Sequence, residues 1–234
     1  MKSNVIIIGG SKNLGKFLCD KFINKHNVIN ISRSKNSSKH VSNFLCDLSN
    51  EEECVATLKK VKKKFKKIST VIICSGDSKK TDINKLNFQK KMNSNFFVVF
   101  NFLENFPKIF KRMHSDIIVF SSIVAKKNIN GAPLDYTICK VALNKYLELK
   151  SKILIKNKIR INVISPGNIL IKGNNWSEKL KNNQKKIKSL IKKSVPINDF
   201  VKPEEILLLI ELILSKKINS MVGSNLVIDG GQIL

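Results

Sequence analysis

Val5-Ile6-Ile7-Ile8-Gly9-Gly10-Ser11-Lys12-Asn13-Leu14-Gly15 is the stretch that decides the fold, because an apolar β-branched segment runs directly into a glycine-rich turn and then a helical pattern. Glycines let the backbone turn tightly and approach a pyrophosphate, and the next helix supplies free N–H groups and a partial positive charge. A glycine-rich turn alone is weak evidence for a cofactor site, but its position between the first strand and the first helix favours a dinucleotide site. The residues expected to contact that cofactor are Gly9, Ser11, Lys12, Asn13, Leu14 and Gly15.

Apolar segments alternate with helical patterns from this turn onward. Strands are expected at Val5–Ile8, Val28–Ser32, Asn43–Cys46, Thr70–Cys74, Ile117–Ser121, Arg160–Ile164 and Leu226–Ile228. Helices are expected near 13–25, 50–67, 85–111, 135–156 and 203–215. The strands are continuously apolar, which indicates burial on both faces and hence a parallel sheet. The pattern predicts an α/β fold, a doubly wound parallel sheet of about seven strands with helices on both faces.

Length and composition indicate one domain. The chain has 234 residues, enough for one large α/β domain over 1–234 and too few for two of full size. Residues 168–198 are the least regular part, polar and carrying Trp176, the only tryptophan. A long excursion after a late strand is expected to form a substrate lid, with a surface insertion as the alternative.

The charge is strongly positive and is carried almost entirely by lysine. The formal net charge is +26, and Arg33, Arg112 and Arg160 are the only arginines. Recognition of phosphates and bases usually uses arginine and interleaved aromatic residues, so we expect no specific nucleic-acid binding. The lysines are interpreted as solvated helix faces, and whether they also steer a substrate or only reflect a compositional bias stays open.

The cysteines, histidines and apolar runs indicate neither a metal site nor a membrane span. The five cysteines are scattered without a C-x-x-C motif, and the three histidines stand alone. The apolar runs fall far short of the ~20 residues needed to cross a bilayer, and no secretory signal is visible. We therefore expect a cytoplasmic protein.

The end of the second expected strand indicates which dinucleotide binds. A carboxylate there would hold the adenosine ribose diol and favour NAD(H), but Val28–Ser32 is followed by Arg33 and Ser34. Lys12 and Arg33 together suit the dianionic 2′-phosphate of NADP(H). The expected cofactor is NADP(H), with NAD(H) the less favoured alternative.

Tyr136 and Lys140 are candidates for proton transfer because they lie one helical turn apart on the same face. A free tyrosine has a pKa of about 10, and a nearby cation stabilises the phenolate and lowers that pKa. Tyr146 and Lys150 repeat the spacing, so the spacing alone is not specific. Tyr136 opens its helix after the loop 128–133, where a side chain can face a cleft, whereas Tyr146 is expected to pack in mid-helix.

Five ordered motifs resemble the short-chain dehydrogenase/reductase family over essentially the whole chain. They are the glycine turn, a strand-end serine at Ser122, Tyr136-x-x-x-Lys140, Ser165-Pro166-Gly167, and Val227-Ile228-Asp229-Gly230-Gly231. The resemblance implies a Rossmann fold and an NADP(H)-dependent oxidoreductase that acts on CH–OH groups. Within the family the chain is most similar to the 3-oxoacyl-[acyl-carrier-protein] reductase group, so a 3-oxoacyl thioester is the expected substrate.

The resemblance also implies a role for each matching residue. Ser122 would hydrogen-bond the substrate oxygen, and Tyr136 would protonate that oxygen or deprotonate the alcohol. Lys140 would bind the nicotinamide ribose and lower the pKa of Tyr136. Asn95 would hold a proton-relay water, with Asn93 as the register alternative. The further cofactor contacts that it implies are Asp47, Gly76, Pro166 and Gly167. A helix cap at Asp47 and a simple strand-end turn at Ser122 are the structural alternatives.

The chain departs from the family pattern in the glycine turn and after the fourth expected strand. Asn13 stands at the middle glycine of the turn, and Ile73-Cys74-Ser75-Gly76 replaces a segment that is usually Asn-Asn-Ala-Gly. The second departure motivates a non-catalytic NADP-binding regulatory or structural subunit. The segment from Pro166 to Lys179, together with Gln232, is also similar to relatives in surface-polysaccharide pathways, so a sugar or polyol dehydrogenase is the other alternative.

The resemblance also bears on partners. Family members are usually oligomeric, so a homodimer or homotetramer is expected. The basic surface would suit an acidic acyl carrier protein that presents the substrate.

Overall fold

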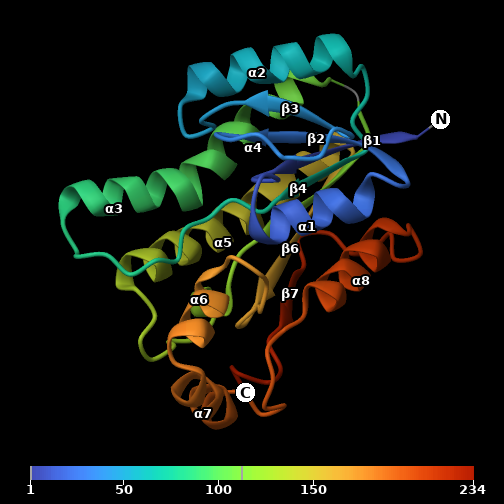
Figure 1. Cartoon of the computed structure of the whole chain (residues 1–234). Coiled ribbons are helices and arrows are strands. Elements are labelled where there is room, and N and C mark those ends of the chain that lie inside the picture. Colours follow the sequence, from blue (N-terminus) through green and yellow to red (C-terminus); the bar gives the residue numbers. More distant parts are fainter. Residues whose placement is uncertain (1, 112) are drawn as a thin grey trace.

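Seven parallel strands form one sheet in the computed structural model, which describes residues 2–111 and 113–234 (Figure 1). The strands are β1 (Ser3–Ile8), β2 (His26–Ser32), β3 (Val41–Leu45), β4 (Thr70–Ile73), β5 (Ser115–Phe120), β6 (Ile159–Pro166) and β7 (Asn225–Ile228). Their order is β3-β2-β1-β4-β5-β6-β7. The direction of winding reverses between β1 and β4, and in such sheets the ligand crevice opens at the carboxyl ends of these strands.

Helices cover both faces of this sheet. The α-helices are α1 (Asn13–Phe22), α2 (Glu51–Lys64), α3 (Lys85–Met92), α4 (Val98–Ile109), α5 (Leu134–Leu154), α6 (Asn175–Asn182), α7 (Gln184–Ser194) and α8 (Pro203–Leu214). Short helices are the π-helical segment Asn93–Phe97 and the 3-10 turns Ile123–Ala125 and Ile155–Asn157. α1 and α8 bury apolar side chains against one face, and α2, α4 and α5 against the other.

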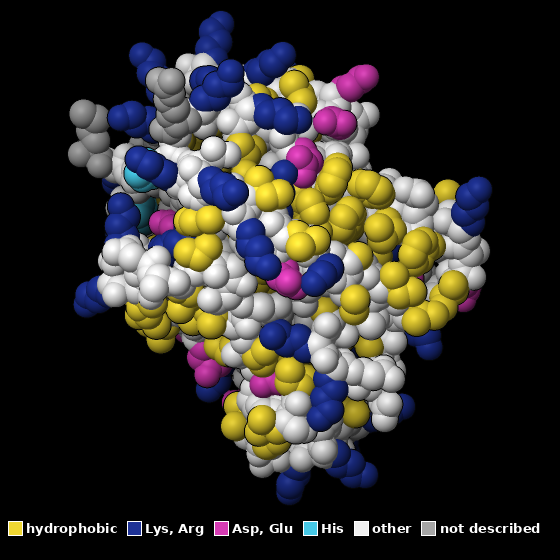
Figure 2. All heavy atoms as spheres, turned by 180° about the vertical axis from the view of Figure 1, so that it is seen from behind, with side chains coloured by type: hydrophobic (Ala, Val, Ile, Leu, Met, Phe, Trp, Pro, Cys, Tyr) yellow, Lys and Arg dark blue, Asp and Glu magenta, His cyan; other side chains and the backbone are white. Residues whose placement is uncertain are grey.

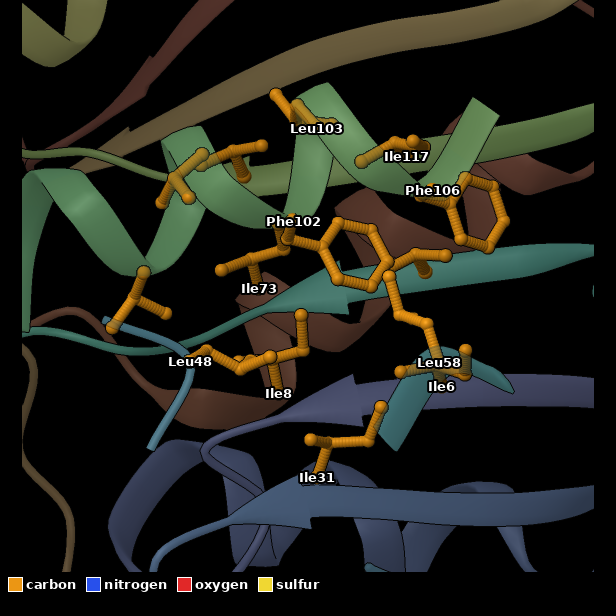
Figure 3. Close-up of a cluster of buried hydrophobic side chains, with 14 of the residues drawn as sticks. Ile6, Ile8, Ile31, Leu48, Leu58, Ile73, Phe102, Leu103, Phe106 and Ile117 are labelled. Carbon is orange, nitrogen blue, oxygen red and sulfur yellow. The ribbon is translucent and has the colours of Figure 1, made fainter. Parts of the chain in front are cut away.

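The larger half of the core lies between the sheet and α2, α4 and α5. Figure 3 shows Phe102 and Phe106 of α4 directed at Ile6 and Ile73 of the strands. All residues of β4 and β6 are buried. β4 is almost entirely apolar, as expected for a strand covered on both faces, whereas β6 buries Arg160, Asn162 and Ser165, each of which is hydrogen-bonded. The predicted doubly wound parallel sheet with helices on both faces is confirmed.

The boundaries of the expected strands and helices differ from the observed ones by a few residues only. One expected helix also differs in its type of helical structure. The long helix expected at 85–111 contains a π-helical turn, because α3 continues through Asn93–Phe97 into α4. π-Turns inside α-helices occur often at functional sites, since the extra residue re-aims the side chains around it.

Residues 168–198 are more regular than expected. They contain α6 and α7, and Ile187, Ile191 and Trp176 form a small apolar cluster with Phe200. Both helices begin at asparagines whose side chains accept backbone N–H groups, Asn174 and Asn183. This cluster is separate from the two cores that cover the faces of the sheet. Figure 1 shows α6 and α7 projecting beyond the strand ends. None of the described helices is long and apolar enough to cross a bilayer.

Candidate active site

The turn after β1 can be built only with glycine at two positions. A Cβ at Gly15 would lie 2.2 Å from the carbonyl oxygen of Gly9, and Gly9 itself has φ +79°. Asn13 occupies the left-handed region at φ 47°, which asparagine tolerates better than most residues. The turn thus brings the backbone close to the start of α1, where free N–H groups face outward.

Lys12 and Arg33 lie in neighbouring turns, after β1 and β2. The hydroxyl of Ser34 lies 2.9 Å from that of Ser11, which joins the turn after β1 to the turn after β2. Lys12 and Arg33 are both exposed. Asp47, after β3, accepts hydrogen bonds from the N–H and hydroxyl of Ser49, so it closes a local turn and does not cap α2.

Tyr136 and Ser122 line the same cavity of about 700 Å³ at the carboxyl end of the sheet. Ser122 lies between the end of β5 and the 3-10 turn Ile123–Ala125, and Tyr136 is in the first turn of α5. The N–H of Tyr136 donates to Oδ1 of Asp135 at 2.7 Å, which fixes the start of that helix. The two side chains that the sequence predicted to act on one substrate oxygen therefore face one space.

Lys140 lies buried one turn below Tyr136. Its side chain is 2% exposed, and Nζ donates to the carbonyl of Phe120 at 3.1 Å. Nζ lies 5.7 Å from the centre of the Tyr136 ring. The ammonium is thus held inside the protein beside Tyr136, away from bulk water.

Asn95 lies in the π-helical segment and is fully buried. A Cβ at Gly76 would lie 3.0 Å from its Oδ1 and 3.4 Å from Nζ of Lys140, so all three residues meet at one point. Asn93, the register alternative, instead accepts a hydrogen bond from the Gln89 side chain on the outer part of the helix. Position therefore favours Asn95 over Asn93.

Burial controls the protonation of the two titratable residues. It raises the pKa of Tyr136 to about 12, while the hydrogen bond with Ser122 works in the opposite direction and the Asp77 carboxylate adds to the rise. Burial lowers the pKa of Lys140 to about 8. The pKa of Tyr136 is therefore raised and not lowered as expected, and Lys140 is not among the groups that shift it.

The wall of the cavity opposite Tyr136 comes from the segment after β6 and from the end of the chain. Pro166 ends β6, and a Cβ at Gly167 would lie 2.9 Å from Asp229 and 3.1 Å from Oε1 of Gln232. Trp176 of α6 also lines the cavity, with Nζ of Lys179 4.5 Å from the centre of its ring. Gln232 had no assigned role in the sequence, because only the fold brings the end of the chain to this wall.

The site fits a nicotinamide dinucleotide. Buried polar atoms without a partner within the described part of the chain include Ser75 Oγ, Ser121 Oγ and Gln232 Oε1, and all three lie at the carboxyl edge of the sheet. Such atoms are costly to bury unless a ligand or water pairs with them. Together with the glycine turn, these atoms fit such a cofactor, of which Gly9 to Gly15 would hold the pyrophosphate and Lys140 the nicotinamide ribose.

Known proteins match this chain over most of its length. The family model described as Enoyl-(Acyl carrier protein) reductase matches residues 22–232. Isoepoxydon dehydrogenase patN from Penicillium expansum is 30% identical over 125 residues, which make up 53% of this chain and 48% of that protein. The match therefore spans about half the length of this curated relative.

Solved structures share the whole fold. A short chain dehydrogenase from Leptospira borgpetersenii serovar Hardjo-bovis (strain JB197), solved with bound NAD+, has a TM-score of 0.87 at 21% identity and covers 100% of this chain and 94% of that chain. L-Sorbose reductase from Gluconobacter frateurii, complexed with NADPH and L-sorbose, has a TM-score of 0.87 at 21% identity, with coverage of 99% and 97%. At these identities the likeness shows a common fold, and the bound molecules are properties of those two proteins.

Proposed function

The chain belongs to the short-chain dehydrogenase/reductase family, whose model it matches over residues 22–232, and on that premise we propose that it transfers a hydride between NADP(H) and a carbonyl or alcohol carbon. The observation that carries the proposal is the convergence of Ser122 and Tyr136 on one cavity, with the Lys140 ammonium buried directly behind them. Asn95 completes the proposed set, because its Oδ1 and Nζ of Lys140 both border Gly76.

Tyr136 is proposed as the proton donor. Its pKa of about 12 keeps the phenol protonated at neutral pH, so it can donate to a substrate oxygen that accepts a second hydrogen bond from Ser122. Bound NADPH would supply the hydride to the carbonyl carbon. The negative charge that develops on the phenol oxygen after proton transfer is stabilised by the hydrogen bond with Ser122, which lowers the pKa of Tyr136.

NADP(H) is proposed over NAD(H) because of the charges at the adenosine end. Lys12 and Arg33 supply cations at the two adjoining turns, and the strand β2 ends without a carboxylate. Known structures of the fold carry either cofactor, as the NAD+ and NADPH complexes above illustrate. The adenosine-end residues therefore carry this part of the proposal.

The lining of the cavity bears on the substrate. The 3-oxoacyl thioester suggested by the sequence would need an apolar channel for its acyl chain and an acidic carrier protein docked on the basic surface. The cavity has apolar side chains, Ile123, Ile129 and Leu190 among them. It also has many amide and hydroxyl side chains beside an indole, namely Asn128, Asn130, Asn168, Asn175, Gln232, Ser78, Ser194 and Trp176. These groups suit a hydroxylated carbonyl compound, which favours a sugar or polyol dehydrogenase as the second candidate.

A homo-oligomer is proposed from the surface of α5. Large apolar side chains are exposed along one stripe of this helix, namely Leu134, Ile138, Val141, Leu149 and Ile153. Figure 2 shows hydrophobic side chains gathered on this side of the molecule. Contiguous apolar patches of this kind mark interfaces, and a second copy of the chain would cover this one.

The test is reduction of a panel of acetoacetyl thioesters and keto sugars by purified protein with NADPH, followed by the loss of reduced nicotinamide absorbance. Tyr136→Phe should lower kcat by orders of magnitude and leave the Kd for NADPH nearly unchanged, whereas Tyr146→Phe is the matched control and should retain turnover. If no carbonyl is reduced while NADPH binds tightly, the non-catalytic NADP-binding subunit replaces this proposal.

A further inference from the structure

Lys91 on α3 is a buried lysine that the proposed reaction does not use. Its side chain is 2% exposed, and lysines are almost never buried unpaired because desolvating an ammonium is costly. Its Nζ donates to Oδ2 of Asp77 at 3.1 Å and to the carbonyl of Lys79 at 2.7 Å. Lys91 therefore holds two points of the segment that follows β4.

Asp77 is bound through its side chain and its backbone. Its Oδ1 accepts the N–H of Lys79 at 2.9 Å, while Oδ2 pairs with Lys91. The N–H of Asp77 donates to Oδ1 of Asn95 at 3.3 Å, and its carbonyl accepts from Nδ2 of Asn95 at 3.1 Å. Nδ2 of Asn95 also donates to the carbonyl of Lys91 at 3.1 Å, which closes the network.

This network supports a segment that has no regular structure of its own. Residues 74–84 form neither helix nor strand, yet a Cβ at Gly76 would lie 3.0 Å from Oδ1 of Asn95 and 3.4 Å from Nζ of Lys140. The same segment departs from the family pattern at Ile73-Cys74-Ser75-Gly76. A shift of its backbone would displace the surroundings of Asn95 and Lys140 together.

The ion pair of Lys91 and Asp77 also affects the electrostatic environment of Tyr136. The Asp77 carboxylate raises the pKa of the phenol beyond the effect of burial, and Lys91 is the cation that pairs with that carboxylate. Lys91 therefore offsets a negative charge close to the proposed proton donor. The other charged or titratable groups around the phenol are Asp135, Cys139 and Lys140 on α5, and Lys127 and Lys179 at the cavity wall.

Resting on the proposed function, we propose that Lys91 and Asp77 are positioning residues whose ion pair holds the segment after β4 against Asn95 and offsets the charge of Asp77. Neither side chain needs to touch the substrate. In the family pattern this segment carries two asparagines, where this chain has Ile73 and Cys74. The ion pair would supply the polar contacts that these two side chains cannot make.

The test compares Lys91→Met, Asp77→Asn and the double variant, each shown to be folded by thermal unfolding. The kcat/KM of carbonyl reduction is measured against pH. Lys91→Met should lower kcat/KM on the order of ten- to a hundredfold, because small displacements of a reacting geometry are costly. The double variant, which carries no unpaired charge, should recover part of this loss.

The two single variants should shift the alkaline limb of the pH profile in opposite directions. Lys91→Met leaves the Asp77 charge unpaired, so the limb at which Tyr136 loses its proton moves to higher pH. Asp77→Asn removes that charge, so the limb moves to lower pH. A purely structural role would leave the limb in place or move it the same way in both variants, and either result would overturn the proposal.

Lys150→Met is the matched control. Lys150 pairs with Glu104 at 2.6 Å, and Glu104 also accepts a hydrogen bond from the hydroxyl of Tyr146 at 2.8 Å. This second lysine–carboxylate pair therefore also involves a tyrosine, but it lies away from the proposed site. This variant should change neither kcat/KM nor the limb. An effect as large as that of Lys91→Met would show that any loss of a half-buried ion pair has the same consequence, and would overturn the specific role of Lys91.

A second measurement separates this proposal from the proposed function. The chain has two tyrosines, so NMR of 13C-tyrosine follows the ionisation of Tyr136 once Tyr146→Phe has assigned the signals. If the wild type reduces no carbonyl, the proposed function fails, but opposite shifts of the Tyr136 titration still support the pair. If the wild type is active and the titration does not move, the pair alone is rejected.

Discussion

The phenol of Tyr136 and the ammonium of Lys140 respond to burial in opposite ways, since burial disfavours the charged form of each. The pKa of the phenol rises to about 12 and that of the ammonium falls to about 8, so both residues are driven toward neutrality. This arrangement favours proton donation by Tyr136 over proton abstraction at neutral pH. It also means that the site lowers the stability of the fold.

Lys140→Met should therefore stabilise the protein at neutral pH. The unfolded lysine has a pKa of about 10.4, so between about pH 8 and pH 10.4 only the unfolded chain holds this proton, and the free energy of unfolding rises with pH across that window. The variant should exceed the wild type by on the order of 2–3 kcal/mol below pH 8, and the difference should vanish toward pH 10.4. Urea unfolding of both proteins without added cofactor measures it, and a difference that is constant with pH would contradict the assignment.

Arg33→Ala tests the choice of cofactor. The variant should raise the KM for NADPH by an amount equivalent to about 1–3 kcal/mol, the usual range for a charge-assisted contact, and should leave the KM for NADH nearly unchanged. The ratio of kcat/KM for the two cofactors is the quantity to measure, with Arg160→Lys, remote at the start of β6, as the control. An unchanged ratio would reject the role of Arg33.

At the scale of elements, the turn between β1 and α1 combines a close approach with two left-handed residues. Gly9 and Asn13 have positive φ, and Gly15 lies against the carbonyl of Gly9. The strain at Asn13 is tolerable for an asparagine side chain, whereas the contact at Gly15 leaves no room for a methyl group. The departure at Asn13 is therefore compatible with the turn.

Gly15→Ala should disrupt this turn. Its Cβ would lie 2.2 Å from a backbone oxygen that cannot move without displacing β1, so we expect a loss of about 1–3 kcal/mol in stability and a large rise in the Kd for NADPH. Gly131→Ala is the control, because it has φ +80° and no atom within 4 Å of the added methyl group. Equal effects of the two variants on NADPH binding would argue against a cofactor site at the turn.

At the scale of the whole molecule, lysines are spread over the surface and are not gathered in one stripe, as Figure 2 shows for one face. This distribution agrees with the interpretation of lysine as a solvating residue. The apolar stripe of α5 differs from this lysine-rich surface and needs a separate explanation.

Leu149→Lys with Ile153→Lys should break the proposed assembly. Both side chains are more than half exposed in the single chain, at 51% and 56%, and lie away from Tyr136. Light scattering after gel filtration should give the mass of an oligomer for the wild type and of a single chain for the double variant. Leu45→Lys, on the opposite edge of the sheet at 54% exposure, should keep the wild-type mass. A wild type that runs as a single chain would reject the assembly.

The sequence by itself determined the fold and the order of the motifs. A strand buried on both faces favours apolar residues, so β4 could be predicted from the sequence alone. The glycine turn could be predicted as well, because its backbone conformation requires particular residues. The positions of Ser122, Tyr136 and Lys140 at the carboxyl edge followed from the same logic, because parallel strands end at one edge.

Only the tertiary structure decided how the site is supported. Gln232 lies at the cavity wall because the chain returns there after β7, and Lys91 meets Asp77 because a helix packs over a strand-end segment 14 residues earlier in the chain. In a chain so rich in lysine, the sequence around Lys91 does not distinguish it from the exposed lysines. Pairing and desolvation depend on three-dimensional packing, which local periodicity does not encode.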